Sequence, residues 1–253
     1  MAVARAPRYP EVASSSLPYL TREQMEHVDH LMIDVYGIQL LQMMENAGRH
    51  LAGLARERFL GGTSVGRHVV VLAGRGGNGG GAMVCARHLA NWGSTVMVAL
   101  TREPEAHSGV PAHQLEILRK VGVRVAHAAD LDRDLSCDLV VDGLIGYSLS
   151  GAPRGITAEM IGWANSQDAP ILSLDTPSGL DVTTGEAYTP AVRASATMTL
   201  ALPKVGLRAP AAQPFVGELY LADISVPPVL YRRMGLVPNP IFAESAFLRI
   251  SLS

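Results

Sequence analysis

The sequence predicts an α/β fold in which a mostly parallel sheet carries helices on both faces. Short apolar runs alternate with helical patterns along the chain, an order typical of β-α-β units. One run, 68–73, leads directly into six glycines within eight residues, 74–81, and then into a helical stretch. No internal repeat or low-complexity linker interrupts this order, so residues 18–253 are predicted to form one domain.

The N-terminal region is expected to add a flexible tail and a helical extension to this domain. The tail, 1–17, lacks the apolar segment of a secretory signal. Thr21 and Gln24 fit a capping box, and apolar residues recur at helical spacing over 25–35. A second amphipathic helix is expected over 39–58.

The remaining elements follow from the alternation itself. Seven apolar runs are expected to be strands: 68–73, 95–100, 124–128, 139–142, 171–175, 197–202 and 218–221. Three stretches between them are expected to be helices: 82–92, 111–121 and 157–166. Ligands of such sheets bind beyond the carboxyl ends of the strands. Three polar residues are expected to meet there: Asn78, Asp142 and Asp175.

Composition narrows the function classes. The net charge of −2 provides no basic surface for nonspecific binding to nucleic acid. The two cysteines, Cys85 and Cys137, suggest buried thiols rather than a disulfide framework or a metal site. No apolar run approaches the roughly 20 residues that cross a bilayer. We therefore expect a cytoplasmic protein without a membrane anchor.

The glycine-rich run after the first strand of the sheet indicates a phosphate-binding turn. Glycine lets backbone N–H groups approach a ligand, and a following helix N-terminus favours negative charge. The pattern G-x-G-x-x-G also fits a tight structural turn. A conventional NAD dehydrogenase is not favoured, because the next strand ends in Thr101 and Arg102 and the acid, Glu103, is displaced beyond it.

Two acidic residues follow later strands. Asp142, followed by glycines, is suited to a cation or a hydroxyl, or else caps a turn. Asp175 precedes a sharp Pro-Ser-Gly turn, where a carboxylate can act as a general base. Asp181 is better explained as a turn residue, and Lys204 either binds anionic ligand groups or is solvated.

Several stretches in the right order resemble landmarks of the YjeF N-terminal domain family, which includes NAD(P)H-hydrate epimerases and apolipoprotein A-I-binding protein-like members. They are 41–48, 74–82, 142–151, 175–181, 201–206 and 217–223. The resemblance implies a Rossmann-like three-layer α/β/α sandwich. It also implies an enzyme that interconverts the S and R forms of hydrated NAD(P)H at C6 of the nicotinamide ring.

The resemblance also implies site residues. A potassium ion would be held by Asn78, Asp142 and Ser178, and Asp175 would be the acid/base. The implied substrate contacts are Gly77, Asn78, Gly79, Gly80, Gly81, Gly146, Tyr147, Ser148, Leu149, Ser150, Gly151, Ala152 and Asp175. The resemblance further implies a dinucleotide as the small-molecule substrate and a separate dehydratase as the pathway partner. The apolar helical N-terminal region suggests self-association, so a homodimer is expected.

The glycine loop departs from the family pattern, N-N-G-G-D-G. Here Gly77–Ala82 reads G-N-G-G-G-A, so the first Asn, the Asp and the last Gly are replaced. The backbone donors remain. Two alternatives therefore stay open: a non-catalytic nucleotide-binding or scaffold protein of the same fold, and an epimerase-like enzyme recruited to another substrate.

Overall fold

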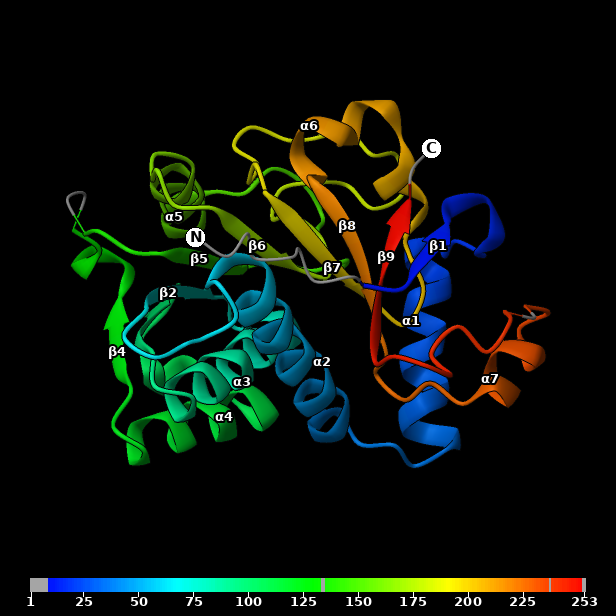
Figure 1. Ribbon diagram of the computed structural model, residues 1–253, viewed down its shortest axis with the longest axis horizontal. Coiled ribbons are helices and arrows are strands. Elements are labelled where there is room, and N and C mark those ends of the chain that lie inside the picture. The colour runs from blue at the N-terminus through cyan, green and yellow to red at the C-terminus, as the bar shows by residue number, and fades with distance from the viewer. Residues whose placement is uncertain (1–8, 133–134, 237, 252–253) are drawn as a thin grey trace, which may run out of the picture.

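A mixed sheet runs through the structure, a computed structural model that describes residues 9–132, 135–236 and 238–251 (Figure 1). In the described residues it has nine strands in the order β1-β9-β8-β7-β6-β5-β2-β3-β4, and all neighbours are parallel except β8 and β9. The strands are β1 Glu11–Ala13, β2 His68–Ala73, β3 Thr95–Leu100, β4 Arg124–His127, β5 Leu139–Gly143, β6 Ile171–Leu174, β7 Ala196–Leu200, β8 Glu218–Ala222 and β9 Phe247–Ser251.

Helices cover both faces of the sheet, which makes the fold a three-layer sandwich. The helices are α1 Arg22–His30, α2 Leu40–Leu54, α3 Gly77–Asn91, α4 Gly109–Lys120, α5 Gly155–Asn165, α6 Gln213–Val216 and α7 Pro228–Arg233. Figure 1 shows α2, α3 and α4 side by side on one face, with α5 and α6 on the other. The predicted α/β class, the mainly parallel sheet and the helical N-terminal extension are confirmed.

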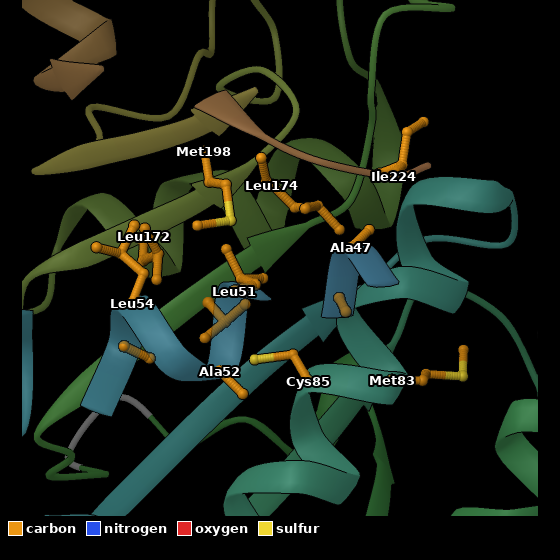
Figure 2. Packing of buried hydrophobic residues seen from close by; sticks show 14 of the residues in the cluster. Ala47, Leu51, Ala52, Leu54, Met83, Cys85, Leu172, Leu174, Met198 and Ile224 are labelled. Atoms are coloured by element: carbon orange, nitrogen blue, oxygen red, sulfur yellow. The ribbon is translucent and has the colours of Figure 1, made fainter. Parts of the chain in front are cut away.

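The core explains why the strands read as continuous apolar runs. In β2, Val69 and Val71 pack with the helices α1 to α4, whereas Val70 and Leu72 pack with α5 on the opposite face. Side chains of a strand alternate between the two faces, so a strand covered on both sides is apolar throughout. Figure 2 shows the core between the sheet and the helices α1 to α4, where Leu51 and Leu54 of α2 lie against Leu172 and Met198 of the sheet.

Most element boundaries agree with the sequence, and the differences have local causes. The strands expected over 171–175 and 197–202 end earlier, because Asp175 and Ala201 adopt positive φ angles of 66° and 64°. The helix expected from residue 82 begins at Gly77. Glycine has a low helix propensity, but packing of this turn against α2 and the sheet overrides it.

The prediction of a flexible tail over 1–17 is wrong for its second half. Residues 1–8 lie outside the described part of the chain. Glu11–Ala13 form β1, which pairs with β9, and Leu17 is buried in the core. β1 has only three residues, and β9 pairs with β8 in antiparallel register, so the alternation of strands and helices predicted neither strand. In the described residues, no helix has the length and hydropathy required to cross a bilayer.

Candidate active site at the carboxyl edge of the sheet

A cavity of about 1180 Å³ opens at the carboxyl edge of the sheet. The chain leaves β2 toward β3 and β4, and then returns to β5 on the other side of β2. Reversals of this kind leave a crevice between the diverging loops, which is where open α/β sheets bind ligands. The loops after β2, β5 and β6 line the cavity. Apolar side chains of α1, of the π-helical segment Leu31–Val35 that follows it and of α2 close it: Met25, Ile33, Leu40, Met43 and Met44.

The glycine-rich turn forms one wall. Gly77, Asn78 and Gly81 line the cavity, whereas Gly79 and Gly80 are buried on the opposite side of the first helical turn. A Cβ at Gly79 would lie 1.8 Å from the carbonyl oxygen of Gly74. The turn is therefore this tight only because glycine stands there. The structure brings three of the five predicted loop residues to the cavity.

A buried ion pair lies at the end of β6. Asp175 is 4% exposed, with its carboxylate in the cavity wall, and its Oδ1 accepts a hydrogen bond from the ammonium of Lys204, which is fully buried. The Lys204 ammonium also donates to the Leu200 carbonyl at 2.9 Å and to Thr199 Oγ1 at 3.2 Å. The other carboxylate oxygen, Oδ2, accepts from the backbone N–H of Tyr147 at 3.1 Å. The ammonium is thus an internal partner, not a solvated one.

The Asn78 amide and the Asp175 carboxylate flank Gly146. A Cβ on Gly146 would lie 3.2 Å from both Asn78 Cγ and Asp175 Oδ2. Within the part of the chain that the structure describes, the buried Nδ2 of Asn78 has no hydrogen-bond partner. Because a buried donor without an acceptor is costly, this amide is available to an acceptor on a bound molecule. An unused donor and a carboxylate therefore stand together at the bottom of the cavity.

Asp142 and Ser178 form a second buried cluster, behind the cavity wall. The Asp142 carboxylate accepts from Ser178 Oγ at 2.6 Å, Ser178 N at 2.9 Å, Ser173 Oγ at 2.8 Å and Leu144 N at 3.2 Å. Burial raises its pKa above the ordinary value, although these bonds act in the opposite direction. No Lys, Arg or His of the described residues forms an ion pair with it.

A hydrogen-bonded pair that the sequence did not predict, Tyr147 and Asp29, also forms part of the cavity wall. The Tyr147 hydroxyl donates to Asp29 Oδ2 at 2.5 Å, and both residues line the cavity. Burial raises the pKa of Asp29, with the Tyr147 bond opposing the shift, and burial raises that of Tyr147. A signal was present, because Asp29 follows Met25 by four residues and precedes Met32 by three. An acid on the apolar face of a helix points into the protein.

The predicted substrate segment reaches the cavity only in part. Gly146, Tyr147 and Ser148 line it. The following residues Leu149, Ser150, Gly151 and Ala152 do not, because the chain turns away: Leu149 is buried and its carbonyl accepts from Arg22 at 3.1 Å. The wall resumes at Arg154.

Comparison with known proteins adds sequence relatives. The family model described as YjeF-related protein N-terminus matches residues 40–206. A protein of Dehalogenimonas lykanthroporepellens described as NAD(P)H-hydrate epimerase is 43% identical over 86% of this chain and 86% of its own length. Another with that description, from Truepera radiovictrix, is 39% identical over 91% of this chain and 100% of its own.

A longer relative and a solved structure complete the comparison. A Moorella thermoacetica protein described as a bifunctional NAD(P)H-hydrate repair enzyme is 35% identical over 82% of this chain, which spans 40% of that protein. The crystal structure of yeast ynu0 has a TM-score of 0.77, with 24% identity over 92% of this chain and 100% of that one. At this identity the likeness concerns the fold, and it agrees with the Rossmann-like sandwich.

Proposed function

The chain belongs to the family of the YjeF-related protein N-terminus, and we propose that it is an isomerase that epimerises hydrated NAD(P)H at C6 of the nicotinamide ring. The observation that carries the proposal is the buried Asp175–Lys204 pair at the bottom of a cavity large enough for a dinucleotide. The glycine-rich turn and the N-terminus of α3 supply backbone donors for the pyrophosphate. The apolar wall of α1 and α2 suits a ring.

The chemistry requires proton transfer at one oxygen. C6 of the hydrate carries a hydroxyl and is bonded to the ring nitrogen. In one route, Asp175 takes the hydroxyl proton and passes it to the ring nitrogen as the C6–N bond breaks, which gives an aldehyde and an amine. The nitrogen then adds to the other face of the aldehyde and gives up this proton, which Asp175 returns to the oxygen. In the other route, the nitrogen lone pair expels the hydroxyl as water, with the proton supplied by Asp175, and a water adds to the opposite face and returns one proton to Asp175. Both routes invert C6 and leave the enzyme unchanged.

The surrounding residues hold the acid/base in place. Lys204 and the Tyr147 N–H bind the two oxygens of Asp175, which fixes the direction in which its carboxylate faces the cavity. The free Nδ2 of Asn78 is placed to donate to the C6 hydroxyl or to the carbonyl formed from it. A base acts efficiently only when its geometry is set beforehand.

We further propose potassium as a bound ion, held by Asn78, Asp142 and Ser178. The support is the charge of Asp142: it is fully buried, and no cation of the described residues pairs with it. Buried charges in proteins are paired or bind metal ions. The three side chains offer the oxygen ligands that a hard cation takes. When bound, the ion would supply the missing positive charge and stabilise the loop after β5.

The test is the conversion of a single epimer. Purified protein is incubated with one epimer of hydrated NADH or NADPH, and the appearance of the other is followed by chromatography. We expect Asp175→Asn to lower the rate by about 100-fold or more, as loss of a general acid/base does. The matched control is Asp181→Asn, because Asp181 lies outside the cavity and accepts hydrogen bonds from the backbone of Thr183 and Thr184.

Three outcomes contradict the proposal. Full activity of folded Asp175→Asn would exclude Asp175 as the acid/base. No conversion by the wild-type protein, with nucleotide binding retained, would favour the scaffold or an enzyme recruited to another substrate. An equal loss in both variants would indicate a structural effect.

We also propose an oligomeric state, a location and a pathway partner: a homodimer in the cytoplasm, with a dehydratase as a separate protein. Relatives described as bifunctional repair enzymes support the pairing of this activity with a second one.

A further inference from the structure

The end of β3 forms a part of the cavity that the proposed reaction does not use. After Leu100, Thr101 is buried and Arg102 is exposed, and both line the cavity. In dinucleotide-binding sheets, an acid at the end of this strand binds the ribose 2′-OH, and an arginine nearby accommodates a 2′-phosphate. Here a neutral hydroxyl stands at the end of the strand, and an arginine follows it.

Two guanidinium groups at this end of the cavity have no partner among the residues that the structure describes. Arg102 follows β3, Arg75 belongs to the glycine-rich turn after the adjacent β2, and both line the cavity. Neither forms a hydrogen bond, an ion pair or a ring contact with any of the described residues. A guanidinium binds phosphate oxygens with paired N–H groups, and two unpaired ones against one cavity favour an anion.

Among the described residues, Glu103 is the acid at this end of the cavity lining, and its ion-pair partner is His127, another lining residue, not Arg75 or Arg102. Its carboxylate lies 3.9 Å from His127 Nε2, at the end of β4, and its side chain is 72% exposed. The other cavity acids, Asp29 and Asp175, lie on α1 and after β6.

The spacing fits a dinucleotide that spans the cavity. Asp175 follows β6, and the order β6-β5-β2-β3 places three strand spacings, roughly 14 Å, between it and the end of β3. A nicotinamide ring at Asp175 and a pyrophosphate at the glycine-rich turn leave the adenosine ribose at β3.

We propose that Arg102, assisted by Arg75, binds the 2′-phosphate of the adenosine ribose, so that the protein acts preferentially on hydrated NADPH. This assignment rests on the proposed epimerase function. It also explains why β3 ends in Thr101 and Arg102 and not in the acid of a conventional NAD site: these residues would select for the 2′-phosphate.

The experiment compares two substrates and two variants. The kcat/KM for epimerisation is measured with hydrated NADPH and hydrated NADH, for the wild-type protein, Arg102→Gln and Arg124→Gln. The control Arg124 is an exposed arginine at the amino end of β4. It therefore lies at the amino edge of the sheet, whereas the cavity opens at the carboxyl edge. We expect the wild type to prefer hydrated NADPH. Arg102→Gln should lower kcat/KM for hydrated NADPH by about 10- to 100-fold and change that for hydrated NADH less than about twofold.

Binding of fragments separates this inference from the proposed function. Adenosine 2′,5′-bisphosphate and adenosine 5′-monophosphate are titrated by calorimetry into wild type, Arg102→Gln and Arg124→Gln. Tighter binding of the bisphosphate, lost in Arg102→Gln alone, supports the subsite even if neither hydrate is epimerised, in which case the proposed function fails by itself.

The inference is overturned if the wild type prefers hydrated NADH, if Arg102→Gln lowers kcat/KM equally for both hydrates, or if both fragments bind alike. A variant Glu103→Gln gives an independent check. Loss of activity on hydrated NADH in that variant would assign the strand end to a ribose hydroxyl instead, whereas a gain or no change with hydrated NADPH agrees with a phosphate.

Discussion

Replacing Lys204 by methionine tests the buried ion pair most directly. Methionine keeps an unbranched apolar chain but removes the ammonium. In the wild-type protein the ammonium bonds to Asp175, to Thr199 Oγ1 and to the Leu200 carbonyl, and Lys204 is 0% exposed. The variant leaves the Asp175 carboxylate buried with the Tyr147 N–H as its principal remaining donor.

The expected cost is large because the remaining charge cannot reach water. Removing one partner of a buried pair destabilises proteins by about 3–5 kcal/mol. For a chain of this size, about 2–4 °C per kcal/mol gives a fall in Tm of roughly 6–20 °C. The free energy of unfolding is measured by urea titration, and the Tm by differential scanning calorimetry.

The chain supplies its own control. It has two lysines, and Lys120 is 72% exposed in a pair with Glu116. Lys120→Met should change stability by less than about 1 kcal/mol. The double variant Asp175→Asn/Lys204→Met should be more stable than Lys204→Met, because it removes the unpaired charge. The reasoning is refuted if Lys204→Met loses less than 1 kcal/mol, or if the double variant is no more stable than the single one.

Three further predictions concern the proposed potassium ion, the glycine-rich turn and Asp29. Potassium at 10 to 100 times its Kd should stabilise the wild type by about 1.4–2.7 kcal/mol relative to choline, and Asp142→Asn should remove the difference; a potassium effect that persists in this variant contradicts the assigned site. Gly79→Ala should destabilise by about 3 kcal/mol, because its Cβ meets a backbone carbonyl at 1.8 Å, whereas Gly162→Ala, inside α5 with nothing within 4 Å of the added Cβ, should stabilise by about 0.5–1 kcal/mol; equal urea midpoints would be contrary to this. Burial raises the pKa of Asp29, so its contribution to stability is complete below the unfolded value of about 3.9 and is lost as pH rises through the folded pKa; Asp29→Asn should gain stability relative to wild type between pH 4 and pH 7, and a difference independent of pH would argue against it.

The sequence predicted the parts of this fold that repeat a simple rule. Strands β2 and β3 have the predicted bounds, because a strand buried on both faces is a continuous apolar run. Asp175 was predicted at the cavity because the carboxyl ends of parallel strands mark the ligand side, whereas Asp142, expected there by the same rule, lies behind the cavity wall. The edge strand β1 and its neighbour β9 were missed, since β1 has only three residues and β9, with Arg249 and Ser251, is not a continuous apolar run.

The burial of Lys204 could not be predicted, because it depends on residues far away in the chain. A lone lysine after a strand is usually solvated. Here Leu20 pairs with the segment around it: the Leu20 N–H donates to the Pro203 carbonyl at 2.8 Å, and the Val205 N–H donates to the Leu20 carbonyl at 3.0 Å. This contact joins residues that are far apart in the chain, so no local sequence pattern predicts it.

The same contact makes the N-terminal extension part of the site. Leu20 forms a parallel β-bridge with Lys204, and Arg22 donates a hydrogen bond to the Leu149 carbonyl. Asp29 accepts a hydrogen bond from the Tyr147 hydroxyl. Residues 20–29 therefore fix both the cation that faces Asp175 and the loop that donates to it. Asp175 itself adopts a positive φ of 66°, which costs an L residue free energy and persists only where the surroundings impose it. The geometry of Asp175, the proposed acid/base, thus depends on the N-terminal extension, which the alternation of strands and helices does not predict.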